Sequence, residues 1–232
     1  EVLMVDPGRL NFALYKNIPE NVKKVEERNP AILFKCVKNP TEVENIRIAE
    51  IKDSVAHVRF MKWLKENVGK ETITEMSASD KLDEFRAEMG GFIRPSFGPI
   101  SAFGEHSAIV HYSSSPETDV ELHEGTFLMT DTGAGFYEGS TDITRTYAFG
   151  EVSQIMKDHF TLVAISNLNL ASPIFKKGCC GMNFDYLARK PFWDRGLDFN
   201  HGTGHGVGYL LNIHEGPAGF RWKYRKGETE VL

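Results

Sequence analysis

The chain has 232 residues, which is enough for one large domain or for one and a half smaller ones at about 150 residues per domain. Hydrophobic residues make up 41% and charged residues 25%, as in ordinary folded proteins, so disordered, collagen-like and coiled-coil classes are excluded. The net charge of -5 comes from 27 basic and 32 acidic residues without a block of lysine or arginine, which argues against nucleic acid as a partner.

The sequence carries no sign of a membrane or secretory protein. No uninterrupted apolar run approaches the roughly 18 residues of a membrane span, and the start of the chain, with Glu1 and Asp6, does not resemble a signal peptide. A cytoplasmic location without a membrane partner is therefore expected. The cysteines, two of which are the adjacent Cys179 and Cys180, favour reduced thiols over a disulfide framework or a zinc site.

The first residues have the pattern of a tail rather than of a domain. The chain lacks an initiator methionine and ends without a terminal signal, so we expect a C-terminally truncated fragment of a longer protein. Residues 1–34 contain a short apolar strand at Val2–Val5, a helical stretch from Leu10 and a second apolar run at Ala31–Phe34. This segment is too short to form its own core.

Two helices are predicted next. Asn39 is placed to cap a long helix, because Pro40 suits the first helical position and Glu42 stands at the capping-box spacing. A second amphipathic helix, capped by Thr74 or Ser77, should follow it. In the first helix, apolar residues step by three or four and are expected to form the buried face: Ile48, Ile51, Val55, Val58, Met61, Leu64 and Val68.

The hydrophobic period changes after residue 93. Short apolar runs broken by Gly, Ser and Pro predict antiparallel strands at Ala108–Tyr112, Thr126–Thr130 and Ile143–Phe149. Helices return after Ser153 and Asn183, and residues 200–215 are strand-like again. This order predicts an α+β domain in which helices pack on an antiparallel sheet, in two similar halves.

Asp131 and Asp142 stand on two of the predicted strands. If Tyr137 and Glu138 form a two-residue hairpin loop, Asp142 pairs with Gly133 and lies diagonally from Asp131 on the same face, about 7 to 8 Å away. Two like charges this close destabilise the sheet unless cations lie between them, and two divalent cations roughly 3.5 to 4 Å apart would fit. The alternative is that both are solvated acids beside turns, the commonest setting of Asp near glycine.

Residues 201–208 read His-Gly-Thr-Gly-His-Gly-Val-Gly. Glycine at every second position disfavours a helix, so His201 and His205 are expected on one side of an extended strand, about 13 Å apart. Because two histidines at that distance do not bind one ion, one is expected as a metal ligand and the other as a substrate contact. The alternative is a glycine-rich loop with incidental histidines.

The remaining histidines carry weaker signals. His111 and His214 each stand at a predicted strand end, where a hydrogen-bonded structural histidine is commoner than a catalyst, and the role of His106 stays open. Three others are expected on helical or turn surface without a role: His57, His123 and His159.

Together these motifs resemble a known family. Six segments occur in the order and spacing of Xaa-Pro aminopeptidases (aminopeptidase P), within the creatinase and methionine-aminopeptidase superfamily, and the resemblance extends from about Phe34 to the end. The segments are Asn39-Pro40-Thr41-Glu42, Ile109-Val110-His111-Tyr112, Thr130-Asp131-Thr132-Gly133, Thr141-Asp142-Ile143-Thr144-Arg145, the run at 201–208 and Asn212-Ile213-His214-Glu215-Gly216-Pro217. The last segment is similar to aminopeptidase P rather than to prolidase, whose histidine is usually followed by aspartate.

The resemblance implies a pita-bread fold, in which helices pack on a curved antiparallel sheet, with its second half incomplete. Residues 1–34 would be the tail of a preceding creatinase-like N-terminal or middle domain, and residues 35–232 the catalytic domain without its C-terminal strands. The resemblance also implies two divalent metal ions, with manganese expected and cobalt or zinc as alternatives. Carried over by position, Asp131 would ligate one ion, Asp142 would bridge both and His205 would bind the other.

The resemblance further implies hydrolysis of the peptide bond before a proline in the second position, by a water that the two ions activate. His111 and His214 would contact the scissile peptide and stabilise the oxyanion or move a proton, while His201 would line the proline side of the cleft. The expected partners are therefore peptides with proline in the second position. Relatives are often dimers, so a homodimer is a further expectation.

The sequence also departs from the family pattern. The family uses two more glutamate ligands, in a Glu-Pro-Gly and an Arg-Ile-Glu segment, and neither segment occurs here, since Glu215, Glu228 and Glu230 stand in other contexts. We therefore expect the 232-residue chain to bind metal weakly or not at all and to be inactive. The alternatives are a prolidase and a non-catalytic pita-bread module that binds peptides or proteins; retention of the two aspartates and the histidine argues against the module.

Overall fold

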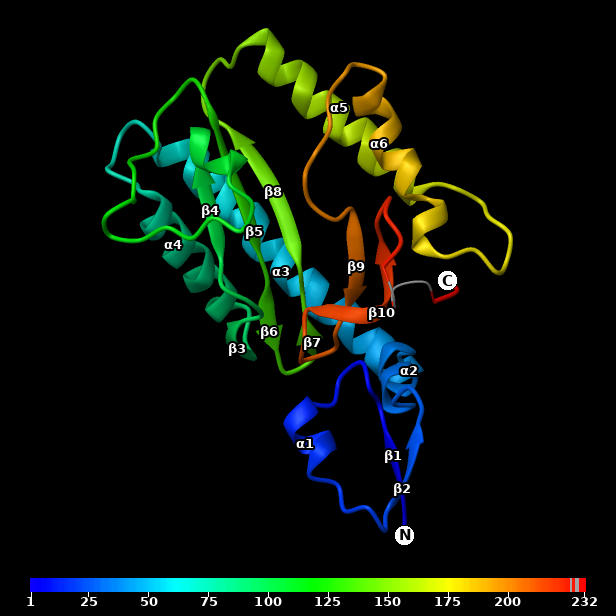
Figure 1. Ribbon diagram of the computed structural model, residues 1–232. Coiled ribbons are helices and arrows are strands. Elements are labelled where there is room, and N and C mark those ends of the chain that lie inside the picture. The colour runs from blue at the N-terminus through cyan, green and yellow to red at the C-terminus, as the bar shows by residue number, and fades with distance from the viewer. Residues whose placement is uncertain (226, 228–229) are drawn as a thin grey trace. The chain divides into compact units, whose positions relative to one another are not determined.

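The computed structural model describes residues 1–225, 227 and 230–232 (Figure 1). The chain divides into two compact units, Glu1–Lys38 and Asn39–Leu232. Within the described residues, the structure has no helix with the length and apolar character that a membrane crossing requires.

The first unit is small. The predicted strand forms as β1 (Val2–Val5), which pairs in parallel with β2 (Lys23–Glu26). The helices are α1 (Phe12–Lys16) and α2 (Ala31–Cys36), so the second apolar run is helical. Val5 is the buried hydrophobic residue of this unit, which agrees with the expectation that the segment is too short for a core of its own.

The second unit opens with the two predicted helices, α3 (Pro40–Asn67) and α4 (Glu75–Glu88). The capping box of α3 is present: Asn39 Oδ1 accepts from the Glu42 backbone N–H at 3.0 Å, and Glu42 Oε2 accepts from the Asn39 backbone N–H at 2.9 Å. Thr74 caps α4 in the same way, with Ser77 as its partner. Local side chains therefore satisfy the first backbone donors of both helices.

The predicted buried face of α3 is largely wrong. Of the seven apolar residues named above, five are exposed, by 37% (Met61) to 64% (Ile51). The face that packs inside instead carries small and polar side chains as well as apolar ones: Ala49, Asp53, Ala56, His57, Phe60 and Leu64. Asp53 is buried there because Arg86 of α4 pairs with it, and a single helix sequence does not reveal such a partner.

Strands follow the two helices and form two antiparallel sheets. The first has the order β4 (Ile100–Phe103), β5 (Phe127–Thr132), β8 (Ile143–Ala148), and the second β3 (Phe92–Pro95), β6 (Ala134–Phe136), β7 (Gly139–Ser140). The predicted strand at Ala108–Tyr112 is wrong, because residues 104–108 form the 3-10 helix η1 (Gly104–Ala108) and a turn follows it. The other two predicted strands are confirmed as β5 and β8 to within two residues at each end.

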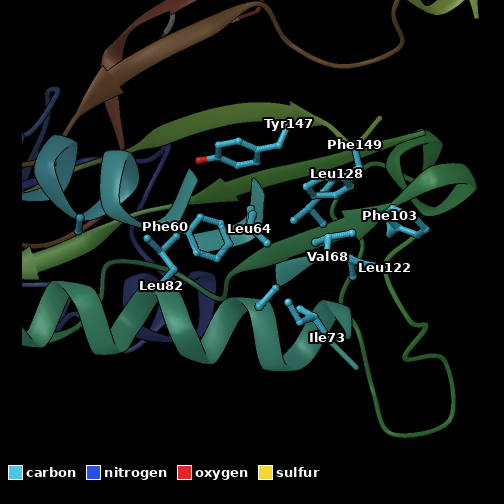
Figure 2. Packing of buried hydrophobic residues seen from close by; sticks show 12 residues of the cluster. Phe60, Leu64, Val68, Ile73, Leu82, Phe103, Leu122, Leu128, Tyr147 and Phe149 are labelled. Carbon is cyan, nitrogen blue, oxygen red and sulfur yellow. The ribbon is translucent and has the colours of Figure 1, made fainter. Parts of the chain in front are cut away.

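The main core lies between α3, α4 and the sheet β4-β5-β8 (Figure 2). Phe60 and Leu64 of α3 and Leu82 of α4 pack against Leu128 of β5 and Tyr147 of β8, and the Phe60 and Tyr147 rings meet edge to face at 5.6 Å. This packing buries one face of the sheet under the helices. Side chains that alternate with the buried ones point to the opposite face, which is thereby available for a site.

The last part of the unit contains α5 (Gln154–Ala171), the 3-10 helix η2 (Gly181–Asn183), α6 (Asp185–Trp193) and the antiparallel pair β9 (Gly204–Val207) and β10 (His214–Phe220). Ser153 caps α5 as predicted, whereas α6 begins two residues after Asn183. The strand-like reading of residues 200–215 holds for β9 and the start of β10, and His201 precedes the strand.

Candidate metal centre

A tight hairpin holds Asp131 and Asp142. Register pairs run from Asp131 opposite Thr144 to Phe136 opposite Gly139, so Tyr137 and Glu138 form the predicted two-residue loop. Asp131 is the fifth residue of β5, and Asp142 directly precedes β8, opposite Gly133 in the same register. The predicted diagonal arrangement of the two aspartates is therefore confirmed at the level of the backbone.

Asp131 lies in a half-buried position on this hairpin. Its neighbours Thr130 and Thr132 are buried toward the helices, so the Asp131 side chain lies on the other face of the sheet. Thr144, directly opposite, donates its hydroxyl to Asp131 Oδ1 at 2.8 Å. Burial raises the pKa of Asp131; the bond from Thr144 opposes this, and the charge of Asp142 adds to it.

His205 brings β9 to the second aspartate. Its Nε2 is 3.3 Å from Asp142 Oδ2, and its Nδ1 is 2.8 Å from the carbonyl oxygen of Gly206. The hydrogen bond with Asp142 raises the pKa of His205, against the effect of burial. The two contacts orient the ring of His205. Nε2, which faces Asp142, is therefore the nitrogen that would ligate a cation shared with Asp142.

His214 and His111 stand beside this group. The rings of His205 and His214 meet edge to face with centroids 4.1 Å apart, as β9 pairs with β10. Burial lowers the pKa of His214, and the nearby His205 lowers it further. The nearby His111 makes a small contribution that lowers the pKa of both Asp131 and His214.

The buried carboxylate of Glu75 supports the turn that contains His111. His111 has a backbone φ of 57°, an uncommon conformation for a residue other than glycine. The next residue, Tyr112, donates its hydroxyl to the buried carboxylate of Glu75 at 2.8 Å, and His106 Nδ1 lies 2.8 Å from the same carboxylate. The role of His106, which the sequence left open, is therefore structural: its contact with Glu75 supports this turn.

His201 and His57 make their contacts outside this group of residues. His201 has local contacts in the described part of the chain: its Nδ1 is 2.8 Å from the Gly202 carbonyl oxygen, and its ring packs on Phe199 with centroids 4.9 Å apart. Strand register, an ion-pair contact and a ring contact thus link four of the six predicted site residues: Asp131, Asp142, His205 and His214. His57, expected on the surface, is buried in α3, with Nδ1 3.0 Å from the Tyr147 hydroxyl.

Among the residues that the structure describes, no three side chains of His, Cys, Asp or Glu converge closely enough to enclose one ion. Glu228 lies outside the described residues. The donors that are present suit a divalent cation in kind, because carboxylates and imidazole are ligands of manganese and zinc. A cation would also offset the burial and the like charge that raise the pKa of Asp131. Asp131, Asp142 and His205 therefore fit part of a metal centre.

Thr144 is a site residue that the motif search missed. The strand register predicted from the two-residue loop places Thr144 opposite Asp131, so the sequence contained the signal that identifies Thr144. The buried groups behind the hairpin, Asp53 and Arg86, gave no local signal of this kind.

Comparison with known proteins decides the family. The model of a family described as Metallopeptidase family M24 matches residues 44–232.

The chain belongs to metallopeptidase family M24.

Similar curated proteins include the "Probable Xaa-Pro aminopeptidase P" of Botryotinia fuckeliana, 37% identical over 97% of this chain and 35% of the relative. The human "Xaa-Pro aminopeptidase 2" is 37% identical over 90% of this chain and 31% of its own length. The chain thus spans about a third of the length of these relatives.

Solved structures give the same result for the fold. The X-prolyl aminopeptidase of Caenorhabditis elegans, described as a cytosolic enzyme with a di-nuclear active site, matches with a TM-score of 0.91 and 33% identity over all of this chain and 37% of that one. The prolidase of Pyrococcus furiosus matches with a TM-score of 0.80 and 27% identity over all of this chain and 65% of that one. The expected α+β pita-bread fold and the resemblance to Xaa-Pro aminopeptidases are confirmed.

Proposed function

We propose that the complete protein is a metal-dependent aminopeptidase that hydrolyses the bond between an N-terminal residue and a following proline. The observation that carries the proposal is the contact between two separate hairpins: His205 Nε2 of β9 lies 3.3 Å from Asp142 Oδ2, and Asp131 lies diagonally from Asp142 in the strand register. Relatives with 37% identity are named Xaa-Pro aminopeptidases, which supports the substrate class.

In this proposal Asp131 and His205 would each hold one of two divalent ions, and Asp142 would contact both. When bound, the ions supply a water of lowered pKa and stabilise negative charge on the attacked carbonyl. Manganese is the proposed metal, with cobalt and zinc as alternatives that a metal exchange experiment separates.

The histidines of the site have roles that follow from their positions. His214 adjoins His205 and, with His111, would donate a hydrogen bond to the developing oxyanion or pass a proton to the leaving nitrogen. His201, whose ring packs on that of Phe199 just before β9, would line the proline side of the cleft. A bond to proline has no N–H, so an apolar slot for the ring is a better recognition element than a hydrogen-bond acceptor.

We further propose that the 232-residue chain alone binds metal weakly and is inactive. Within the described part of the chain, the three candidate ligands Asp131, Asp142 and His205 are too few for two ions, because even a single structural or catalytic zinc has four ligands. Measurable cleavage by this chain with added manganese would contradict that part of the proposal.

The test is peptide hydrolysis by the complete protein with added Mn²⁺. Asp142→Asn should lower kcat/KM by more than about 100-fold, because it removes the carboxylate proposed to contact both ions. Asp158→Asn is the matched control: Asp158 is an exposed residue of α5 that accepts a hydrogen bond from Gln154, and this variant should keep the parent activity. Unchanged activity in Asp142→Asn would overturn the proposal.

Prolidase is the second candidate, because prolidase structures match this fold with TM-scores up to 0.80. Cleavage of Xaa-Pro dipeptides in preference to longer peptides would favour prolidase, and the reverse preference would favour the aminopeptidase. Peptide binding without cleavage in the complete protein would favour the third reading, a non-catalytic pita-bread module.

Location and assembly are also proposals. The relative from C. elegans is described as cytosolic, and on that likeness we propose a cytoplasmic location, which cell fractionation tests. We propose a homodimer, and a monomer mass in light scattering of the complete protein would contradict it.

A further inference from the structure

A buried ion pair lies between the helices and the hairpin of the candidate site. Asp53 of α3 is fully buried and Arg86 of α4 is 1% exposed. Arg86 Nε donates to Asp53 Oδ1 at 2.8 Å, and Arg86 Nη2 donates to Asp53 Oδ2 at 3.2 Å. This bidentate contact links the two helices rigidly, because the planar guanidinium matches the carboxylate at two points.

The same pair continues into both strands of the hairpin. Arg86 Nη2 also donates to Thr132 Oγ1 at 2.9 Å, and Thr141 Oγ1 donates to Asp53 Oδ2. Both threonines are buried at 1% exposure or less. We call Asp53, Arg86, Thr132 and Thr141 the anchor cluster.

The anchor cluster touches the residues next to the candidate ligands. Thr132 follows Asp131, and Thr141 precedes Asp142. Because successive side chains of a strand point to opposite faces, the threonines face the helices while the aspartates face the site. Each aspartate is thus one peptide unit away from a fixed point behind the sheet.

The second half of the unit contains a comparable arrangement. Arg189 Nε donates to Asp185 Oδ2 at 2.9 Å, with both side chains buried in α6. Asp185 Oδ1 accepts from Thr203 Oγ1 at 2.6 Å, and Thr203 stands two residues before His205. A buried Asp-Arg pair with a threonine therefore stands behind the His205 segment as well.

Stability alone is a weak reason for such pairs, since replacing a buried ion pair by apolar residues of similar volume is often neutral or stabilising. The location of the two pairs behind the candidate ligands suggests a different role for them. The cluster joins the residue that follows Asp131 to the residue that precedes Asp142, through Arg86 and Asp53, and so bears on the spacing of the two carboxylates.

We propose that the anchor cluster is a positioning device that holds Asp131 and Asp142 at the spacing a pair of metal ions requires. The inference rests on the proposed function, in which these two carboxylates are ligands. Thr132 and Arg86 act through their neighbours and are positioning residues.

The test is the affinity of the complete protein for Mn²⁺ alone, measured by electron paramagnetic resonance. Thr132→Val keeps the shape of the side chain and removes the acceptor of the Arg86 bond, so Mn²⁺ affinity should fall about 10-fold. Thr132→Ser keeps the hydroxyl and should retain the parent affinity. Thr141→Val is a second variant of the same kind, for use if Thr132→Val does not fold.

Two controls separate the possible causes. Leu122→Ala removes a buried core side chain outside the anchor cluster and should lower the free energy of unfolding without changing Mn²⁺ affinity. If Leu122→Ala weakens Mn²⁺ binding as much as Thr132→Val, or if Thr132→Val binds like the parent, the positioning role is wrong. Asp131→Asn tests the premise: parent affinity in that variant would overturn the proposed function itself.

Discussion

His57 shows how far burial changes a single residue. It lies against Tyr147 and Arg86 inside the core side of α3, and burial lowers its pKa from an ordinary 6.5 to about 4. The folded protein therefore keeps His57 neutral in a pH range where the unfolded chain binds a proton.

This difference predicts a pH dependence of stability. The folded pKa lies below the unfolded one, so the stabilising effect is complete above about pH 6.5 and is lost as the pH falls toward about 4. The loss should reach about 3 kcal/mol in the free energy of unfolding. Urea unfolding at a series of pH values measures it, with His57→Gln as the variant that lacks the titrating group. Equal pH dependence in both proteins would contradict the prediction.

Single residues also mark the limit of the sequence argument. Strand register predicted that Asp131 and Asp142 share one face, and the family resemblance added His205, whose Nε2 lies 3.3 Å from Asp142 Oδ2 in the structure. Their role as metal ligands stays a prediction. Asp53, Arg86 and the burial of His57 were not predictable, because each depends on a partner from another element rather than on a neighbour in the chain.

Among the elements, the β5 to β8 hairpin determines the site. Its register was predictable because a two-residue loop leaves one pairing in which the apolar residues face the helices. The strand predicted at residues 108–112 does not form, because the apolar run lies in a turn in which Tyr112 donates a hydrogen bond to Glu75. The buried face of α3 was also predicted wrongly, because most of its regularly spaced apolar residues are exposed in the structure.

At Gly133 of this hairpin the neighbouring atoms leave no room for a side chain. A Cβ there would lie 2.1 Å from the Thr141 carbonyl oxygen and 2.2 Å from Ser96 Oγ. Gly133→Ala should therefore push the two strands apart and lower the free energy of unfolding by about 3 kcal/mol or more. Gly98→Ala is the control, because a Cβ at Gly98 meets nothing within 4 Å. Urea unfolding of the two variants measures the difference, and similar stabilities would show that the strands yield freely.

For the molecule as a whole, the sequence indicated the fold through its motifs rather than through its composition. Length and charge excluded broad classes, while the order of helices and strands gave an α+β arrangement that the structure and its M24 relatives confirm. The chain spans about a third of its curated relatives, so the activity of the complete protein stays a proposal.

The location of bound metal decides that proposal. Crystals of the complete protein grown with Mn²⁺ should give two adjacent peaks of anomalous scattering, one beside Asp131, one beside His205, with the Asp142 carboxylate in contact with both. Absence of peaks at these three side chains, in a protein that still cleaves Xaa-Pro peptides, would contradict the assignment of the metal centre.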